Sequence, residues 1–413
     1  MSIELLRMAT INVAEDLFFN YLQQVKDAWN AVGVYDDSFT GATEITGNTI
    51  WNNSRSVIGN ITIDNGATLT ITSTAKFLKN NSIIVKRGGK LIVDGGVLTS
   101  FSECNSMWEG VRIEGSSTDR QSYTNQGVVI LQNGATIENA NIGIATWIAS
   151  ETGEIDYTTS GGIIQANDAI FSNNKTAIEF IPFTNRNINN IEISNLSYFT
   201  NCTFLIDENN FLEANGYSFK VHVHLYAVSN IKFKGCLFYN NLPLSNPQSG
   251  RGIESYGAGF TVDEFCPGGA YIGCSCPQTS IRSYFYGFYK AIEANGSLDQ
   301  KTFTVDHTNF ENNYLGIVSI AVHNFTVIRS EFNLLINTNP ATIGILMTKS
   351  TGYTIEENLF YASEEISPIN ETFPIGINVI KSGAAENIIR RNIFEYLGHG
   401  ILAQEINSNG NTY

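Results

Sequence analysis

From residue 48 onward, hydrophobic and polar positions alternate in short stretches that end at Gly and Asn turns. The first such stretches lie at 61–63, 69–71, 83–85 and 91–93, and their period of two is that of β-strands. Each stretch is too short to bury its own apolar side in a hairpin sheet. Stacking each strand on the equivalent strand of the next coil solves this problem, so the pattern predicts a solenoid.

A repeated spacing marks the coils in the rest of the chain. A Phe is followed at a constant distance by Gly or Ala and then by Ile, which opens the next strand. The pairs are Phe171 with Ala177-Ile178, Phe285 with Ala291-Ile292, Phe310 with Gly316-Ile317 and Phe394 with Gly400-Ile401, and Ile137 with Gly143-Ile144 has Ile in place of Phe. The wide gap between Ala177 and Gly252 leaves room for one further coil near 220–228. A coil of about two dozen residues with three short strands is typical of a parallel β-helix.

The position two residues before the Phe supports this register, because it holds a small or hydrogen-bonding residue in each coil. It is Ala135, Ala169, Cys202, Cys236, Ser283, Thr308, Ser330, Asn358 and Asn392. Like side chains then lie above one another at the roughly 4.8 Å spacing of paired strands. Cys202 and Cys236 are expected to be buried reduced thiols, because parallel neighbouring Cβ vectors suit a disulfide poorly.

The fold class that follows is all-β, a single-stranded right-handed parallel β-helix over 48–413. Residues 1–47 form a helical segment and a linker in this interpretation, since Leu5, Leu6, Val13 and Leu17 recur at helical intervals. Longer loops should interrupt the coils and form a lateral rim, where a solenoid usually contacts ligands. They are expected at 150–160, 207–218, 242–250, 261–279, 336–342 and 363–373.

Charge and composition limit the classes of partner that the chain is expected to bind. The 413 residues include 39 acids and 24 bases, giving a net charge of −15 that disfavours nucleic acid and anionic membrane surfaces. No apolar run of about 18 residues is present, so no membrane span is expected. The acidic balance allows structural Ca²⁺ without requiring it, and no cofactor is predicted. Cys266, Cys274 and Cys276 share one loop, where a disulfide is an open alternative to free thiols; a metal site is disfavoured because a CxxC partner is missing.

The segment GNITIDNGATLTITSTAKFLKNNSIIVKRGGKLIVDGGVLTS, followed by MWEGVRIEG, resembles the opening of large right-handed β-helix proteins on the surface of Bacteroidota-type bacteria. Later coils resemble the repeat of pectate lyase-like proteins. The resemblance covers residues 48–413 and implies export by type IX secretion to the cell surface or the extracellular space. The chain shows neither the signal peptide nor the sorting domain of that pattern, so we expect it to be part of a longer protein.

Candidate chemistry lies on the strand that follows Gly-Ile, where Ile points inward and the next residue outward. The predicted outward stripe contains acids, imidazoles and aromatic rings, which together suit a sugar groove. The candidate ligand-binding residues are Trp147, Glu179, His222, His224, Glu254, Tyr256, Glu293 and Asn295. A solvated sheet face that tolerates these residues is the alternative.

Glu254 and Glu293 are the only candidate catalytic residues, because adjacent coils place their carboxylates at the short spacing of retaining glycosidases. His222 and His224 offer two imidazoles, which is too few for a metal site, and none is predicted. Arg112 stands too far from the acids for a pectate lyase mechanism. The sequence therefore favours a non-enzymatic surface stalk or glycan-contact module over a polysaccharide hydrolase or lyase. It leaves the ligand and the oligomeric state open, a trimeric fibre included.

Overall fold

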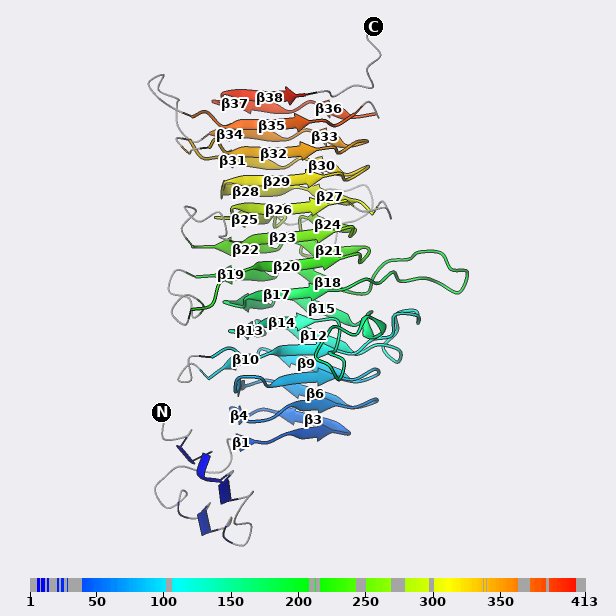
Figure 1. Cartoon of the computed structure of the whole chain (residues 1–413), viewed down its shortest axis with the longest axis vertical. Helices are drawn as coiled ribbons and strands as arrows, with labels where there is room; N and C mark the ends of the chain where they lie inside the picture. Colours follow the sequence, from blue (N-terminus) through cyan, green and yellow to red (C-terminus); the bar gives the residue numbers. More distant parts are fainter. Residues whose placement is uncertain are drawn as a thin grey trace.

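The chain forms a long stack of coils in a computed structural model (Figure 1). The structure describes residues 6–7, 9–11, 13–14, 21, 24–25, 28, 39–101, 106–207, 212, 216–242, 250–268, 279–296, 301–336, 338, 340–362, 372–383 and 386–405. Three strands per coil build three parallel sheets of 13, 13 and 12 strands, which we name sheets A, B and C.

Sheet A consists of β1 (Phe39–Thr40), β4 (Arg55–Val57), β7 (Thr74–Phe77), β10 (Val97–Ser100), β13 (Thr136–Glu138), β16 (Ile170–Ser172), β19 (Thr203–Ile206), β22 (Leu237–Asn240), β25 (Ser283–Tyr286), β28 (Thr308–Asn313), β31 (Glu331–Leu334), β34 (Leu359–Ala362) and β37 (Ile393–Glu395). Sheet B consists of β2 (Thr43–Ile45), β5 (Ile61–Ile63), β8 (Ser82–Val85), β11 (Gly110–Ile113), β14 (Ile142–Ala145), β17 (Thr176–Phe180), β20 (Val221–Tyr226), β23 (Arg251–Tyr256), β26 (Lys290–Asn295), β29 (Leu315–Ile320), β32 (Ile343–Thr348), β35 (Ile375–Ile380) and β38 (His399–Gln404). Sheet C consists of β3 (Asn48–Trp51), β6 (Thr68–Ile71), β9 (Lys90–Asp94), β12 (Val128–Gln132), β15 (Ile163–Asn167), β18 (Tyr198–Thr200), β21 (Ile231–Lys234), β24 (Phe260–Asp263), β27 (Phe303–Asp306), β30 (Thr326–Ile328), β33 (Thr354–Glu356) and β36 (Ile388–Arg390). One 3₁₀ turn, η4 (Tyr157–Thr159), lies in the loop after β14.

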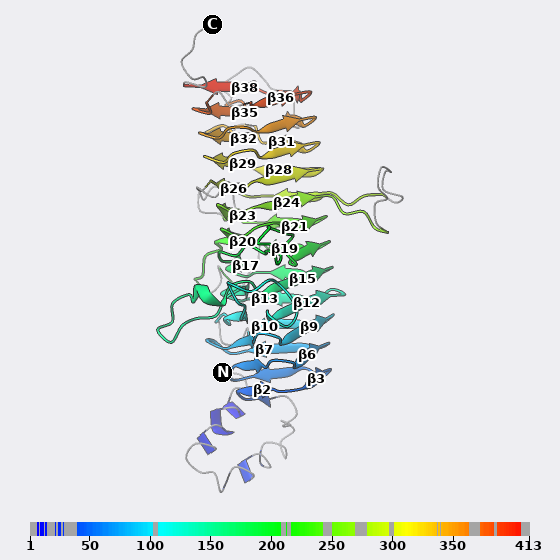
Figure 2. The same ribbon diagram turned by 90° about the vertical axis from the view of Figure 1, so that its right-hand side faces the viewer.

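The predicted fold is confirmed: the chain is a right-handed parallel β-helix, as Figure 2 also shows from the side. Each strand pairs with the strand of the same sheet in the next coil. The further coil expected between Ala177 and Gly252 is present, with β20 as its sheet B strand. Pairing starts earlier than expected, because β1 and β2 precede residue 48 and pair with β4 and β5. The described residues from 6 to 28 are almost all helical.

The repeated Phe forms one continuous column inside sheet A. Phe310 pairs in register with Phe332, and their rings stack with centroids 4.6 Å apart and planes 1° apart. The column continues through parallel rings 4.4 to 5.2 Å apart at Phe171, Phe204, Phe238, Phe285, Phe310, Phe332, Phe360 and Phe394. Burying one such ring contributes about 1.5–3 kcal/mol, so this column is a main source of stability.

Beside the Phe column, small polar side chains form the predicted hydrogen-bonded ladder. The amide of Thr308 donates to Ser330 Oγ at 3.2 Å, and the amide of Ser330 donates to Asn358 Oδ1 at 2.9 Å. The amide of Asn358 donates in turn to Asn392 Oδ1 at 3.0 Å. The ladder satisfies backbone donors at the corner where strand pairing is interrupted.

The Gly before the inward Ile345 is explained by backbone proximity. A Cβ at Gly344 would lie 2.7 Å from the carbonyl oxygen of Gly376 and 2.7 Å from Cδ1 of Phe360. The ring of Phe360 therefore packs over Gly344, and in this coil a Cβ fits only if that ring or the Gly376 carbonyl moves. The constant spacing of Phe and Gly-Ile in the sequence reflects this contact.

The cysteines agree with the expectations as far as they are described. Cys202 and Cys236 are buried free thiols in the ladder, and burial raises the pKa of Cys236. Cys266 is disulfide-bonded, whereas Cys274 and Cys276 lie outside the described residues. Among the described residues, no helix is long and apolar enough to pass through a bilayer.

Candidate functional site

The outward face of sheet B carries the candidate residues in one column. Its register partners, coil by coil, are Arg112, Ala145, Glu179, His224, Glu254, Glu293, Val318, Leu346, Asn378 and Leu402. Glu179, His224, Glu254 and Glu293 therefore occupy four successive coils, as the sequence pattern predicts. The C-terminal part of the column is mostly apolar, so the polar chemistry is confined to the central coils.

His224 lies between two carboxylates. Its Nδ1 is 3.3 Å from Glu179 Oε1, and its Nε2 is 3.9 Å from Glu254 Oε2. Burial alone would raise the pKa of Glu179, but hydrogen bonds from His224 and Trp147, with the charges of His224 and Lys220, hold it below its usual value. Glu179 is thus an ionised group that orients its neighbours.

Glu254 and Glu293 share one cation. The Nε of Arg251 is 3.3 Å from Glu254 Oε1 and also binds Glu293, which accepts a 2.7 Å hydrogen bond from Lys290 Nζ. Burial would raise the pKa of Glu293, but the hydrogen bonds and charges of Lys290 and Arg251 lower it. Glu293 is therefore held in the charged form, which is unsuited to a general acid.

Trp147 differs from its predicted role as a free stacking platform. It is 9% exposed and packs against Ala145 and Ile181. Its indole N–H donates to Glu179 Oε2 at 2.9 Å, and the guanidinium of Arg112 lies 5.3 Å from the ring centroid. Trp147 is therefore not available for sugar stacking, because its ring is covered and its indole N–H is bonded within the protein.

His222 also differs from its predicted outward position. It precedes the inward Val223 and so occupies the position that Gly252 has in the next coil. The side chain is 1% exposed, lies against the rings of Phe219 and Phe288, and hydrogen-bonds the carbonyl of Tyr239 at 3.1 Å. Burial lowers the pKa of His222 to about 3, so it is a neutral core residue that shares no face with His224.

Tyr226 and Tyr256 form an exposed aromatic pair on sheet B. They are register partners in β20 and β23, and each is 43% exposed. Asn295 continues this second outward column in β26. Sequence reasoning missed Tyr226, because it paired His222 with His224; aligning Val223 with Ile253 as the inward residues would have found it. Tyr256 lies edge-on to His224, with centroids 6.1 Å apart, so this surface borders the charged column.

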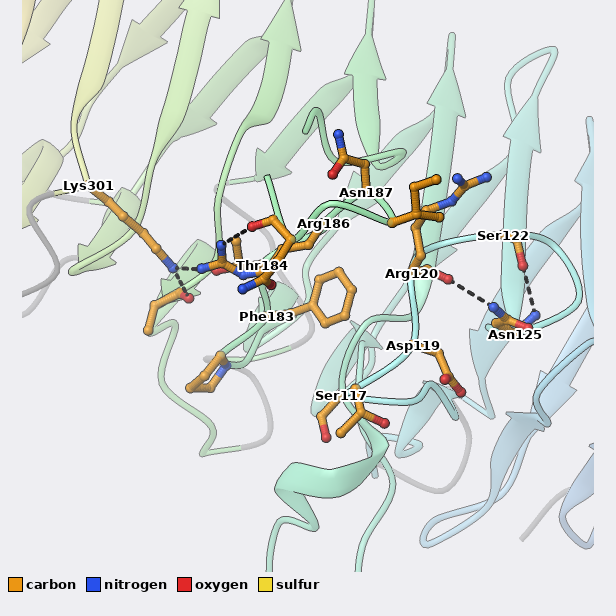
Figure 3. A pocket seen from close by; sticks show the side chains of 15 residues that line it. Ser117, Asp119, Arg120, Ser122, Asn125, Phe183, Thr184, Arg186, Asn187 and Lys301 are labelled. Atoms are coloured by element: carbon orange, nitrogen blue, oxygen red, sulfur yellow. Dashed lines mark hydrogen bonds between the residues drawn. The ribbon is translucent and has the colours of Figure 1, made fainter. Parts of the chain in front are cut away.

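A pocket of about 800 Å³ opens where the sheet B strands end (Figure 3). One wall comes from the loop between β11 and β12, and another from the loop between β17 and β18. Lys301 closes a third side, donating to the carbonyl of Ala227, directly after Tyr226, and to Thr184 Oγ1 at 3.3 Å. The full lining is Ser117, Thr118, Asp119, Arg120, Ser122, Asn125, Pro182, Phe183, Thr184, Arg186, Asn187, Ile188, Asn190, Ala227 and Lys301.

Buried side-chain amides fix these two loops to each other. The amide N–H of Gln121 donates to Asn185 Oδ1 at 3.0 Å, and its side chain donates to Asn195 Oδ1 at 3.1 Å. Gln121 Oε1 accepts from the backbone of Leu196 at 2.8 Å, and all three amide side chains are buried. Neither loop was among those expected from the sequence. The signal is the long polar stretch between one coil's sheet B strand and its sheet C strand.

One further cluster lies at the corner between sheets C and A. Ligand atoms of Asp263, Asp306 and His307 lie within 4.8 Å of one another. Burial raises the pKa of Asp263, and the neighbouring Asp306 carboxylate acts in the same direction. Arg329 binds Asp306 through both of its carboxylate oxygens, with Nε donating to Oδ1 at 2.9 Å. Because the Arg329 guanidinium already pairs with the Asp306 carboxylate, we interpret the cluster as an ion-pair network.

Comparison with known proteins gives no assignment: no family model matches the chain, and no curated protein matches it.

Proposed function

We propose that this chain is a surface β-helix protein that contacts polysaccharide through the outer face of sheet B. The alignment of Tyr226 with Tyr256 carries this proposal. Two exposed rings in adjacent coils offer apolar platforms for pyranose rings, and the rigid sheet holds them without an entropic cost of ordering. Asn295, the register partner of Tyr256, can donate and accept hydrogen bonds with sugar hydroxyls, whereas Glu254 and Glu293 are each 6% exposed and paired with cations.

Contact without cleavage fits the charged column best. A retaining glycosidase needs one carboxyl group with a raised pKa to donate a proton. Here Arg251 binds both Glu254 and Glu293, and the pKa of Glu293 is lowered. Polysaccharide hydrolysis or elimination remains the alternative function, with these two residues as its catalytic candidates.

The setting of this activity is part of the proposal. The resemblance of the coils to Bacteroidota surface proteins supports export, by type IX secretion, to the cell surface or the extracellular space. The regular stack supports a role as a rigid stalk that holds the contact surface away from the cell.

The test is a panel of plant, algal and animal polysaccharides incubated with the full chain. Binding is measured by affinity electrophoresis, and cleavage by reducing-end release and by ultraviolet absorbance of unsaturated products. We expect retardation by at least one polysaccharide and no new ends. Cleavage that disappears in Glu254→Gln or Glu293→Gln would instead establish the enzymatic alternative, and absence of any binding would overturn the proposal.

A further inference from the structure

The pocket beside Tyr226 differs in charge from the rest of the chain. Its lining contains three cations, Arg120, Arg186 and Lys301, and one acid, Asp119. Asp119 is paired with Arg87, with Nη2 and Oδ2 2.8 Å apart, so its charge is offset. The whole chain has a net charge of −15. A positive pocket on so acidic a protein indicates an anionic ligand group.

The two arginines retain donors for a ligand. Arg186 uses one N–H to bind the carbonyl of Asn190 at 3.0 Å, and a guanidinium has five such donors. Arg120 is exposed at the opposite wall, as Figure 3 shows. One guanidinium group can donate two parallel hydrogen bonds to two oxygens of the same sulfate or carboxylate group.

The walls are also prearranged. Besides the Gln121 contacts, buried Gln126 accepts from the amide of Ser116 at 2.7 Å and donates to the carbonyl of Asp119 at 3.2 Å. Asn185 donates to the carbonyl of Ser194 at 2.8 Å. Buried amides that fix loop backbone on both sides of a pocket lower the entropic cost of binding.

We infer that this pocket binds an anionic substituent, a sulfate ester or a carboxylate, of the polysaccharide that Tyr226 and Tyr256 contact. This inference rests on the proposed function, since Ala227 joins the pocket to Tyr226 in the chain. A sugar chain with sparse charges fits better than a densely charged polyanion, because the acidic protein repels the latter at long range.

The test compares a sparsely sulfated galactan, the same galactan after desulfation, and the same galactan with sparse carboxylate groups, each titrated calorimetrically at low and high salt. The wild-type chain should bind one of the two anionic polymers at least about tenfold more tightly than the neutral galactan, with a preference that salt weakens. The double variant Arg120→Gln/Arg186→Gln should lose most of that preference. Lys232→Gln, on the exposed face of sheet C, removes one charge elsewhere and should retain it.

The outcomes separate the two proposals. Stronger binding of the sulfated galactan identifies sulfate as the ligand group, and stronger binding of the carboxylated galactan identifies carboxylate. Equal binding of all three polymers, unchanged in the double variant, would overturn the pocket assignment and leave glycan contact at the tyrosines intact. Failure of every polysaccharide, including the wider panel, would overturn both.

Discussion

Trp147 donates its indole N–H to Glu179 Oε2 at 2.9 Å, so two residues that resemble ligand contacts in the sequence are in fact partners of each other. Trp147→Phe removes this donor from a largely buried carboxylate. We expect a loss of about 1–3 kcal/mol in the free energy of unfolding, because hydrogen bonds to buried charged groups are among the stronger ones. Denaturant unfolding measures this loss. Polysaccharide affinity should stay unchanged, and a large drop in it would return Trp147 to the binding surface.

Glu293 should make the free energy of unfolding decrease as the pH falls into the acidic range. Its pKa is lowered in the folded chain, so its ionised form stabilises the fold at pH values above the unfolded pKa of about 4.3. That contribution is lost as pH falls below 4.3 through the folded pKa. Glu293→Gln removes it, so wild type should be more stable than the variant at pH 7 and the difference should shrink towards pH 3. A difference that is constant with pH would show that Lys290 and Arg251 do not hold the charge.

His222 should also make the free energy of unfolding decrease as the pH falls, over a wider pH range than Glu293. It is neutral and buried with a pKa of about 3, whereas an unfolded His has a pKa of about 6.5. Between these values the unfolded chain binds the extra proton, so His222 reduces stability by about 1.4 kcal/mol for each pH unit below 6.5. His222→Gln keeps a polar side chain near the Tyr239 carbonyl and should flatten this part of the pH profile. Chemical unfolding at pH 4, 5, 6 and 7 would show an unaltered slope if the imidazole were solvated.

Gly344→Ala tests the contact behind the repeat. The added Cβ meets the Gly376 carbonyl oxygen and the ring of Phe360 at 2.7 Å. Overpacking of this kind costs about 1–3 kcal/mol, which thermal unfolding would detect. Gly47→Ala is the matched control, since its Cβ meets nothing within 4 Å. Equal melting temperatures for the two variants would contradict this explanation of the Gly-Ile spacing.

The repeat predicted the fold so well because each coil buries the same positions. The Phe column, the ladder through Ser330 and Asn358, and the charged column in sheet B all follow from a period that is visible in the sequence. Side-chain partners are not periodic, and the sequence could not show that Trp147 is covered. His222 was misplaced by one step along the strand, because a large residue stood where other coils have Gly or Ala.

The pocket lay beyond prediction for a different reason. Its walls are insertions between repeat units, so no neighbouring coil indicates their shape. Gln121 reaches Asn185 and Asn195 across a wide gap in the sequence, and such pairings are determined by three-dimensional packing alone. Tyr226 was within reach of sequence reasoning, since its register follows from Val223.

The most direct test of the account is calorimetric titration of the best polysaccharide with three forms of the chain: wild type, Tyr226→Ala/Tyr256→Ala and Tyr226→Phe/Tyr256→Phe. Loss of two stacking platforms should weaken binding by about fivefold or more, at about 0.5–1.5 kcal/mol for each ring, while the Phe variant keeps the platforms and binds within a few-fold of wild type. Melting temperatures should agree among the three, because both side chains lie on the outer face. Undiminished affinity in the Ala variant would contradict the assignment of this sheet face as the polysaccharide-contact surface.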